Sequence, residues 1–360
     1  MLLLSIEETK PYMKLAKPIV DAEGNILLNK GCTLTSKAIK QLSRLGVFHI
    51  YVEDDRLGPI VIKDIIQEVT RRKCLKVTKE IMTNAKVGNV ILPDKVTAII
   101  QELLNELLTN PMILTSLTDV RLIKEYTLNH SVSVAVLAIL MGYNLGLTKE
   151  ELAILGIGAL LHDIGKSKVS DAILDKPGKL TEEEFSQVKV HTEIGYQLLT
   201  DSKKFNQLVC NIAFQHHEKW NGSGYPRGLR GSEIHPFAQI VAIADVYDAL
   251  TSDRIYRRRF LPCEALDLMA SSGGQDFDPF LLQRFLESIT LYPVGSVVML
   301  NDGRIAVVIE QNRGCPARPV IRLIDSRITG TCSSNFPRFD IYDINLRENK
   351  HLTINNVLSM

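Results

Sequence analysis

The residues best suited to chemistry are a histidine and an aspartate at the end of an apolar segment. His162 and Asp163 are adjacent and lead into Ile164-Gly165-Lys166. An imidazole beside a carboxylate can ligate one metal ion or reach two neighbouring ions. The same residues also fit an ordinary helix end, with Gly165 in the left-handed conformation and a basic side chain near the helix dipole. The pair alone leaves a metal site and a helix cap equally open.

Further histidines and aspartates in the same part of the chain favour the metal site. A single buried histidine is usually a hydrogen-bonded core residue, but burying many beside carboxylates is costly without a shared cation. Imidazole and carboxylate without thiolate favour iron, manganese or a similar ion over structural zinc. If Asp163 bridges two such ions, they can activate water and hold both oxygens of a phosphoester. The candidate ligands are His130, His162, Asp163, His191, His216, His217 and Asp245.

The elements that must position these residues form a predicted all-helical domain at 118–290. Two helices are predicted to begin with capping boxes, at Thr148 and at Thr181. In a capping box, a threonine and a glutamate three residues later accept hydrogen bonds from unpaired backbone amides of the first turn. The first of these helices is expected to end at Gly165, and the second to carry His191. Further helices are predicted from Asp119 to Gly146, ending at His216-His217-Glu218, from Phe237 to Leu250, and starting at Pro262 and at Asp278-Pro279.

Smaller parts are expected on either side of this domain. Residues 1–56 predict a small α+β domain, with Thr35 capping its helix, and 57–117 predict a connector of two helices. Ordinary packing is the first interpretation of the connector, and homodimerisation is the alternative. Residues 291–360 predict a small β module, because Asn301-Asp302-Gly303 is a hairpin turn between alternating segments. A further strand is expected at Val320–Ile324, so the fold class is mainly α with small α+β and β parts.

Composition limits the classes of partner. The chain has 360 residues, 45% of them hydrophobic, with 42 basic against 41 acidic residues, which argues against DNA and anionic membranes. The six cysteines include no Cys-x-x-Cys pair, as expected in a reducing cytosol. Ser131–Thr148 is uncharged, but its polar residues favour a buried core helix over a membrane span. The N-terminus has no signal-peptide pattern. We therefore predict a cytoplasmic protein without a membrane span.

Taken in order, the motifs closely resemble the HD-GYP domain, a branch of the HD phosphohydrolases. The resemblance covers about 119–289 and is more specific than the His-Asp pair alone. The motifs are His162-Asp163-Ile164-Gly165-Lys166, His191 with Gly195, His216-His217-Glu218, Asn221-Gly-Ser-Gly-Tyr-Pro226 and Asp245-Val-Tyr-Asp248-Ala-Leu-Thr-Ser-Asp-Arg254. The resemblance implies hydrolysis of the bacterial second messenger cyclic di-GMP to pGpG, and in some members onward to GMP.

The resemblance also implies roles for single residues. The seven candidates above match metal ligands, with Asp163 as the bridge and His130 as a further, upstream ligand. Lys166 matches a lysine near the scissile phosphate, where its charge would stabilise the transition state. Arg254 and Arg257 match positions that hold the substrate phosphates, although a solvated basic run is the alternative. Gly224, Tyr225 and Pro226 match a substrate loop, which could equally be a structural lip.

Three departures from the family pattern are visible. Tyr126 stands where some members have a glutamate that binds a third metal, so we predict two metal ions, iron or manganese. Asn221 replaces a frequent aspartate and Ile255 a frequent proline, but neither removes a ligand. Two other functions stay open: a catalytically weak receptor or scaffold that binds the nucleotide or signalling proteins, and a phosphohydrolase for another cyclic dinucleotide.

Overall fold

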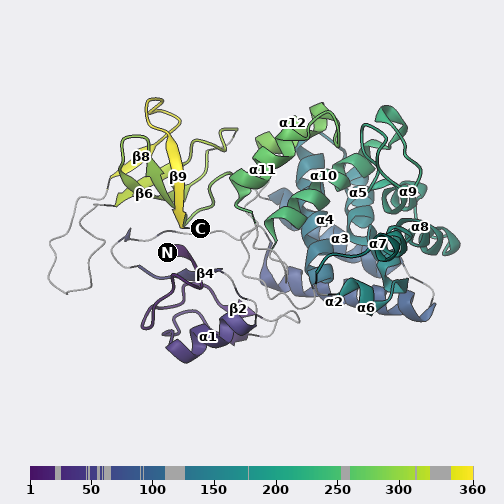
Figure 1. Cartoon of the computed structure of the whole chain (residues 1–360), viewed down its shortest axis with the longest axis horizontal. Coiled ribbons are helices and arrows are strands. Elements are labelled where there is room, and N and C mark those ends of the chain that lie inside the picture. The colour runs from purple at the N-terminus through teal and green to yellow at the C-terminus, as the bar shows by residue number, and fades with distance from the viewer. Residues whose placement is uncertain are drawn as a thin grey trace.

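The computed structural model has three parts that follow one another along the sequence (Figure 1). They are a small N-terminal α+β unit, a large helical part and a C-terminal sheet, so the predicted mainly α fold class is confirmed. The boundaries of the four predicted domains remain predictions. The structure describes residues 1–20, 26–45, 47, 49–54, 57–58, 60, 66–89, 91, 93–109, 126–176, 178–252, 260–312, 314–324 and 342–359.

Two antiparallel strand pairs and one helix form the N-terminal unit. Strand β1 pairs with β4, and β2 pairs with β3. As predicted, Thr35 caps the helix, because its side chain accepts a hydrogen bond from the Ala38 backbone amide. The elements are β1 (Leu2–Ser5), β2 (Ile19–Val20), β3 (Ile26–Leu28), α1 (Ser36–Arg44) and β4 (His49–Val52).

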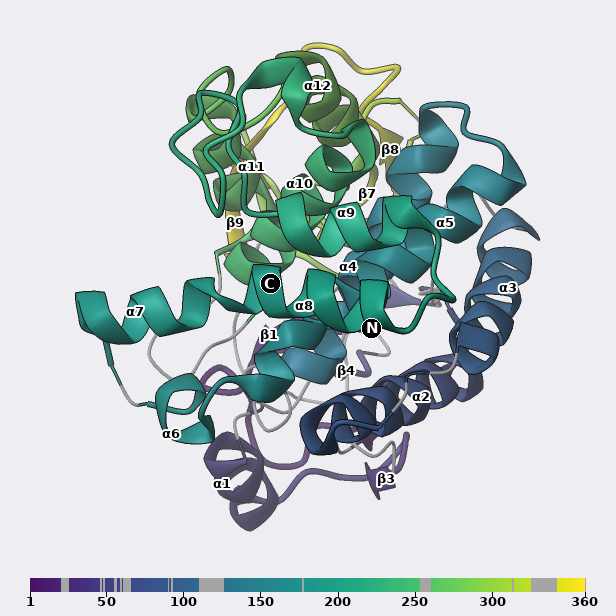
Figure 2. The same ribbon diagram turned by 90° about the vertical axis from the view of Figure 1, so that its right-hand side faces the viewer.

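The helical part follows, and both predicted capping boxes are present, at Thr148 and at Thr181. Figure 2 shows α8 and α9 running side by side across one face of this part. The elements are α2 (Glu68–Val87), α3 (Pro93–Thr109), α4 (Tyr126–Asn144), α5 (Lys149–Leu161), η2 (Ile164–Lys168), α6 (Asp171–Leu174), α7 (Glu182–Lys189), α8 (His191–Asp201), α9 (Gln207–Gln215), η3 (Gly231–Glu233), α10 (Pro236–Thr251), α11 (Pro262–Ser271) and α12 (Pro279–Ser288).

Helix α4 is the central helix of this part. Residues 130–142 are buried on every face of the helix, and α2, α5, α10 and α12 pack around it. A helix that is apolar all round is stable in water when other helices cover it, as predicted for Ser131–Thr148. Within the described ranges, no helix is long and apolar enough to cross a membrane.

Helices α2 and α3 belong to the same core. Cys74 and Ile81 of α2, and Ile100 and Leu104 of α3, lie in one apolar cluster with residues of α4 and α5. The apolar faces of the predicted connector are therefore covered within the chain, which agrees with ordinary packing. The homodimer stays a prediction.

Several helix ends differ from the sequence-based expectation. Helix α5 ends at Leu161 rather than at Gly165, because His162 is its cap and the next residues form the separate turn η2. The helix that Thr181 caps stops at Lys189, and His191 begins a new helix. Helix α9 stops at Gln215, one residue before His216. The predicted cap Asp119 lies outside the described residues.

The C-terminal sheet has five described strands in the order β8-β7-β6-β5-β9. The predicted hairpin is confirmed: β5 and β6 are antiparallel, and Gly303 in the turn has a φ of 84°. The backbone amide of Leu3 donates to the Gly295 carbonyl at 3.1 Å, which ties β1 to the start of the sheet. The strands are β5 (Val297–Leu300), β6 (Ile305–Glu310), β7 (Val320–Ile324), β8 (Asp343–Asn345) and β9 (Ile354–Ser359).

Candidate metal centre and active site

A close backbone contact between η2 and α8 assembles one side of the site. A Cβ added to Gly165 would lie 1.9 Å from the carbonyl oxygen of His191 and 2.6 Å from the backbone nitrogen of Gly195. Gly165 does not have a positive φ, so the helix-cap interpretation of this residue is wrong. The absence of a side chain is needed for the close approach. The contact brings Asp163, two residues earlier, beside His191.

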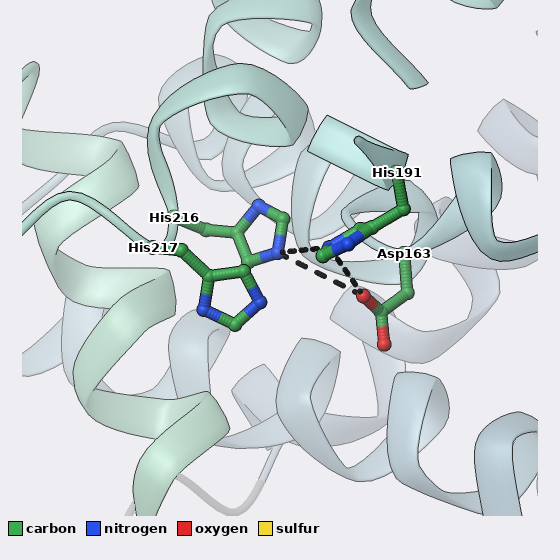
Figure 3. A group of neighbouring side chains, drawn as sticks. All are labelled: Asp163, His191, His216 and His217. Atoms are coloured by element: carbon green, nitrogen blue, oxygen red, sulfur yellow. Dashed lines mark hydrogen bonds and ion pairs between the residues drawn. The ribbon is translucent and has the colours of Figure 1, made fainter. Parts of the chain in front are cut away.

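Asp163 lies in the histidine cluster with 1% of its surface exposed, and Figure 3 shows its contacts with His191 and His216. Its Oδ1 atom is 3.3 Å from Nε2 of His191 and 3.7 Å from Nε2 of His216. Its Oδ2 atom is 3.3 Å from Nε2 of His162 and 3.9 Å from Nε2 of His130. One carboxylate therefore faces two groups of imidazoles, one with each oxygen.

Asp245 and His217 complete the cluster. Asp245 Oδ1 lies 3.0 Å from His130 Nε2, and Asp245 Oδ2 lies 3.9 Å from His217 Nδ1. Within each of two groups, the possible ligand atoms all lie within 4.8 Å of one another. The groups are Asp163, His191, His216 and His217, and His130, His162 and Asp245. The structure thus brings together all seven residues that the sequence proposed as ligands.

Three of the buried imidazoles are oriented by the backbone. Nδ1 of His162, His191 and His216 lies 2.7, 2.6 and 3.0 Å, respectively, from the carbonyl oxygen three residues earlier. A carbonyl can only accept, so Nδ1 carries the proton and Nε2 keeps its lone pair. A histidine that binds a metal through Nε2 needs this tautomer.

The polar atoms of the cluster fit a divalent metal ion. His162 Nε2 and Asp163 Oδ1 are buried and form no hydrogen bond with any described residue. Such an atom costs about 1–3 kcal/mol when it stays unsatisfied. The Lys166 ammonium lies 2.5 Å from Asp163 Oδ2, so this carboxylate already attracts a cation. Imidazole nitrogens and carboxylate oxygens are ligands for iron, manganese and related ions.

Protonation states in the cluster also suit a metal. Burial alone would raise the pKa of Asp163, but Lys166 and His162 hold it well below its usual range. Burial lowers the pKa of His216 to about 4, against the opposing effect of Asp163. Burial and the neighbouring His216 lower the pKa of His217 well below its usual range. At neutral pH the carboxylate is therefore charged and these two imidazoles are neutral, the forms that bind a metal.

Asp248 is a site residue to which the sequence gave no role. Its Oδ2 atom lies 2.8 Å from Nδ1 of His130, and the residue is 2% exposed. A carboxylate behind a ligating histidine fixes the tautomer and makes Nε2 more basic. The available signal was the spacing from Asp245, because residues three apart lie on one face of a helix.

Asp248→Asn is expected to weaken metal binding about 10- to 100-fold, since His130 loses its orienting carboxylate. Competition with a chromophoric chelator measures the metal affinity. Asp267→Asn, at an exposed position of α11, is the matched control. Wild-type affinity in Asp248→Asn would contradict the positioning role.

Glu218 holds the loop at 221–230 against the centre. Its Oε1 accepts a hydrogen bond from the Arg227 amide at 2.7 Å, and its Oε2 accepts one from the Leu229 amide at 2.9 Å. The residue is 4% exposed. The sequence placed Glu218 in a motif without giving it this role, which depends on contacts nine and eleven residues away.

Trp220 ties the same loop to the segment before α12. Its backbone amide donates to the Asp276 carbonyl at 3.0 Å, and the Asn221 amide donates to the Gln275 carbonyl at 2.8 Å. The indole ring lies beside Gly231, at the other end of the loop. The loop is therefore anchored on both sides.

The predicted substrate residues of this loop lie beside the candidate metal centre. A Cβ added to Gly224 would lie 2.5 Å from the His217 carbonyl oxygen, so the backbone could not approach with a larger residue. The centres of the Tyr225 and His217 rings are 4.8 Å apart, with 31° between the planes. Burial, with the nearby charges of Asp163 and Asp245, raises the pKa of Tyr225, so its hydroxyl stays protonated.

Pro226 follows Tyr225 through a cis peptide bond. The two predicted phosphate-binding residues, Arg254 and Arg257, lie outside the residues that the structure describes.

Comparisons with known proteins identify the family. A family profile described as an HD domain matches residues 114–281, and one described as a KOW domain associated with HD domain matches residues 297–360. A cyclic di-GMP phosphodiesterase of Pseudomonas aeruginosa is 35% identical over 275 residues, which are 75% of this chain and 66% of that protein. The 3′3′-cGAMP-specific phosphodiesterase 3 of Vibrio cholerae is 40% identical over 168 residues, 47% of this chain and 36% of that protein.

A solved structure agrees with the fold. The HDG"Y"P protein from Bdellovibrio bacteriovorus superposes with a TM-score of 0.51 at 21% identity, covering 79% of this chain and 97% of that one. The chain spans about two thirds of the length of the Pseudomonas relative and 36% of the Vibrio one. The resemblance drawn from the motifs is confirmed: this chain belongs to the HD-domain family.

Proposed function

We propose that this chain is a metal-dependent phosphodiesterase that hydrolyses cyclic di-GMP to pGpG, with GMP as a further product if the linear dinucleotide is cleaved again. The observation that carries the proposal is the Asp163 carboxylate, which faces one group of imidazoles with each oxygen. Lys166 and the Tyr225 loop lie beside it. The name of the Pseudomonas relative supports the same substrate.

The proposal includes two divalent ions, iron or manganese. His191, His216 and His217 would hold one ion and His130, His162 and Asp245 the other, with Asp163 shared between them. When bound, such ions lower the pKa of water and offer positive charge to a phosphoester. The absence of thiolate ligands in both groups supports iron or manganese over structural zinc.

The chain's own residues would orient the substrate. Hydrolysis adds water across one P–O ester bond, so negative charge grows on the phosphate oxygens as the bond breaks. The Lys166 ammonium, 24% exposed and within reach of Asp163, can turn to such an oxygen and stabilise that charge. Because Gly224 has no side chain, its backbone lies close to that of His217, and the Tyr225 ring packs against the His217 ring.

Lys166→Met is expected to lower kcat about 100-fold while leaving the metal content unchanged, since it removes a charge but no ligand. Elemental analysis and steady-state kinetics measure the two effects. Lys168→Met is the matched control, because the exposed Lys168 donates instead to the Lys86 carbonyl at 3.0 Å. Loss of metal from Lys166→Met would show that the role assigned to Lys166 is wrong.

The proposed function is tested by anaerobic purification, elemental analysis and incubation with cyclic di-GMP, followed by chromatography of the products. About two equivalents of iron or manganese, together with pGpG or GMP, are expected. Metal without turnover, but with measurable nucleotide binding, would favour the receptor. A protein that binds no metal would overturn the proposal.

A phosphodiesterase for a hybrid cyclic dinucleotide is the second candidate. The name of the Vibrio relative supports it, because a metal centre reads the phosphate and the surrounding pocket reads the base. Comparing kcat/KM for cyclic di-GMP and 3′3′-cGAMP decides between them. The homodimer, the signalling partners and the cytoplasmic location stay predictions.

A further inference from the structure

An exposed aromatic ring stands next to the candidate active site. Phe185 on α7 is 44% exposed, and its ring packs edge-to-face with the Tyr225 ring, with 6.4 Å between the ring centres and 84° between the planes. Tyr225 in turn lies against His217. Helix α7 extends beyond α8 at the edge of the helical part (Figure 2). Phe185 is therefore one ring away from a ligand of the metal centre, and much of its surface is open.

A lysine lies close to both of these rings. The Lys189 ammonium lies 4.7 Å from the centre of the Phe185 ring and 5.5 Å from the centre of the Tyr225 ring. It forms no ion pair with any carboxylate in the described part of the chain. A cation–π contact at an exposed site is weak, roughly 0.5–1 kcal/mol. We call Phe185, Lys189 and Tyr225 the α7 corner.

We propose that the α7 corner binds the nucleotide of the substrate that does not carry the scissile phosphate. Phe185 stacks against the purine base of that nucleotide, and Lys189 contacts its phosphate. This inference rests on the proposed function, because it assigns a second binding position to the same substrate. The metal ligands by themselves predict neither the base stacking nor the second phosphate contact.

The chemistry of the corner matches that ligand. In proteins that bind single-stranded nucleic acid, aromatic side chains stack on the bases and positive charge attracts the phosphates. Phe185 keeps 44% of its surface in water, so part of the ring is open to a base. A cyclic dinucleotide has two phosphates, and only one of them can be cleaved at a time, so a second cation near the centre has a ligand to bind.

The test compares two substrates in Phe185→Leu, which keeps an apolar side chain but removes the stacking face. With cyclic di-GMP, kcat/KM should fall about tenfold or more, the scale of losing one base–aromatic stack, mainly through KM. With methyl p-nitrophenyl phosphate, a short diester that has no base, the rate should not change. Phe185→Trp should restore the KM for cyclic di-GMP.

Phe280→Leu is the matched control. Phe280 is 57% exposed on α12, and the Arg284 guanidinium lies 5.4 Å from its ring centre, so it has the same kind of contact on another helix. Lys189→Met tests the other half of the corner. It should raise the KM for cyclic di-GMP and reduce the dependence of that KM on salt concentration, because one phosphate contact is lost.

Each result decides the inference. Wild-type kcat/KM for cyclic di-GMP in Phe185→Leu would overturn it, and so would an equal fall for both substrates, which would indicate support of the metal centre. If the unmodified protein cleaves the short diester but no cyclic dinucleotide, the proposed function fails. In that case calorimetric titration with cyclic di-GMP tests the corner, and equal affinity in the unmodified protein and Phe185→Leu would overturn the inference.

Discussion

Asp163→Asn is expected to leave a folded protein that holds no metal ion and hydrolyses cyclic di-GMP at least about a thousandfold more slowly. The amide has nearly the shape of the carboxylate but lacks its charge, and both groups of imidazoles depend on that charge. Metal ions contribute several kcal/mol of transition-state stabilisation to phosphoester hydrolysis, and each 1.4 kcal/mol is tenfold in rate. Elemental analysis and product chromatography measure the two losses.

A folded state must be verified for this variant, since Asp163 is buried beside Lys166. Circular dichroism should show wild-type helix content. The exposed change Asp267→Asn on α11 should leave metal content and turnover unchanged. If Asp163→Asn kept its metal and lost only turnover, Asp163 would act on the substrate rather than as the shared ligand.

Gly165→Ala is expected to destabilise the fold by about 3 kcal/mol, the upper end for overpacking, and to weaken metal binding. The new Cβ would lie 1.9 Å from the His191 carbonyl oxygen, and backbone cannot yield as a side chain can. Moving α8 away from η2 would separate His191 from Asp163. Urea denaturation and chelator competition measure the two effects.

The opposite glycine supplies a matched control. A Cβ on Gly195 would meet its nearest neighbours at 3.4–3.6 Å, which is ordinary contact. Gly195 lies inside α8, where alanine is favoured over glycine by about 1 kcal/mol. Gly195→Ala should therefore be neutral or stabilising. If both variants are equally stable, the close backbone approach is not what selects glycine at position 165.

Features set by neighbouring residues could be predicted from the sequence. The capping boxes at Thr148 and Thr181 and the hairpin turn at Gly303 depend on residues at most four apart, and all are present. The candidate ligands were found because many histidines and aspartates occur in a region expected to be buried, and because the motifs resemble a known family. The structure brings those residues together, and their roles remain proposals.

Features set by distant residues could not be predicted. Asp248 supports His130, which is 118 positions away, and no local pattern indicates that pair. The reason for glycine at 165 is the backbone of His191, which belongs to another helix. Strand β9 was missed because its partner, β5, lies more than 50 residues earlier. The corner formed by Phe185 and Tyr225 depends on tertiary contact in the same way.

The position of Trp220 allows one part of this molecule to be followed by fluorescence. The chain contains one tryptophan, and it lies where the loop at 221–230 is tied to the segment before α12. Emission from a selectively excited indole therefore comes from one place, so nucleotide binding at the loop can be followed without a label. Unfolding of the N-terminal unit or of the C-terminal sheet should barely change that emission. A melting curve followed by tryptophan fluorescence would thus describe the helical part, and any difference from the curve followed by circular dichroism would reveal that the three parts unfold separately.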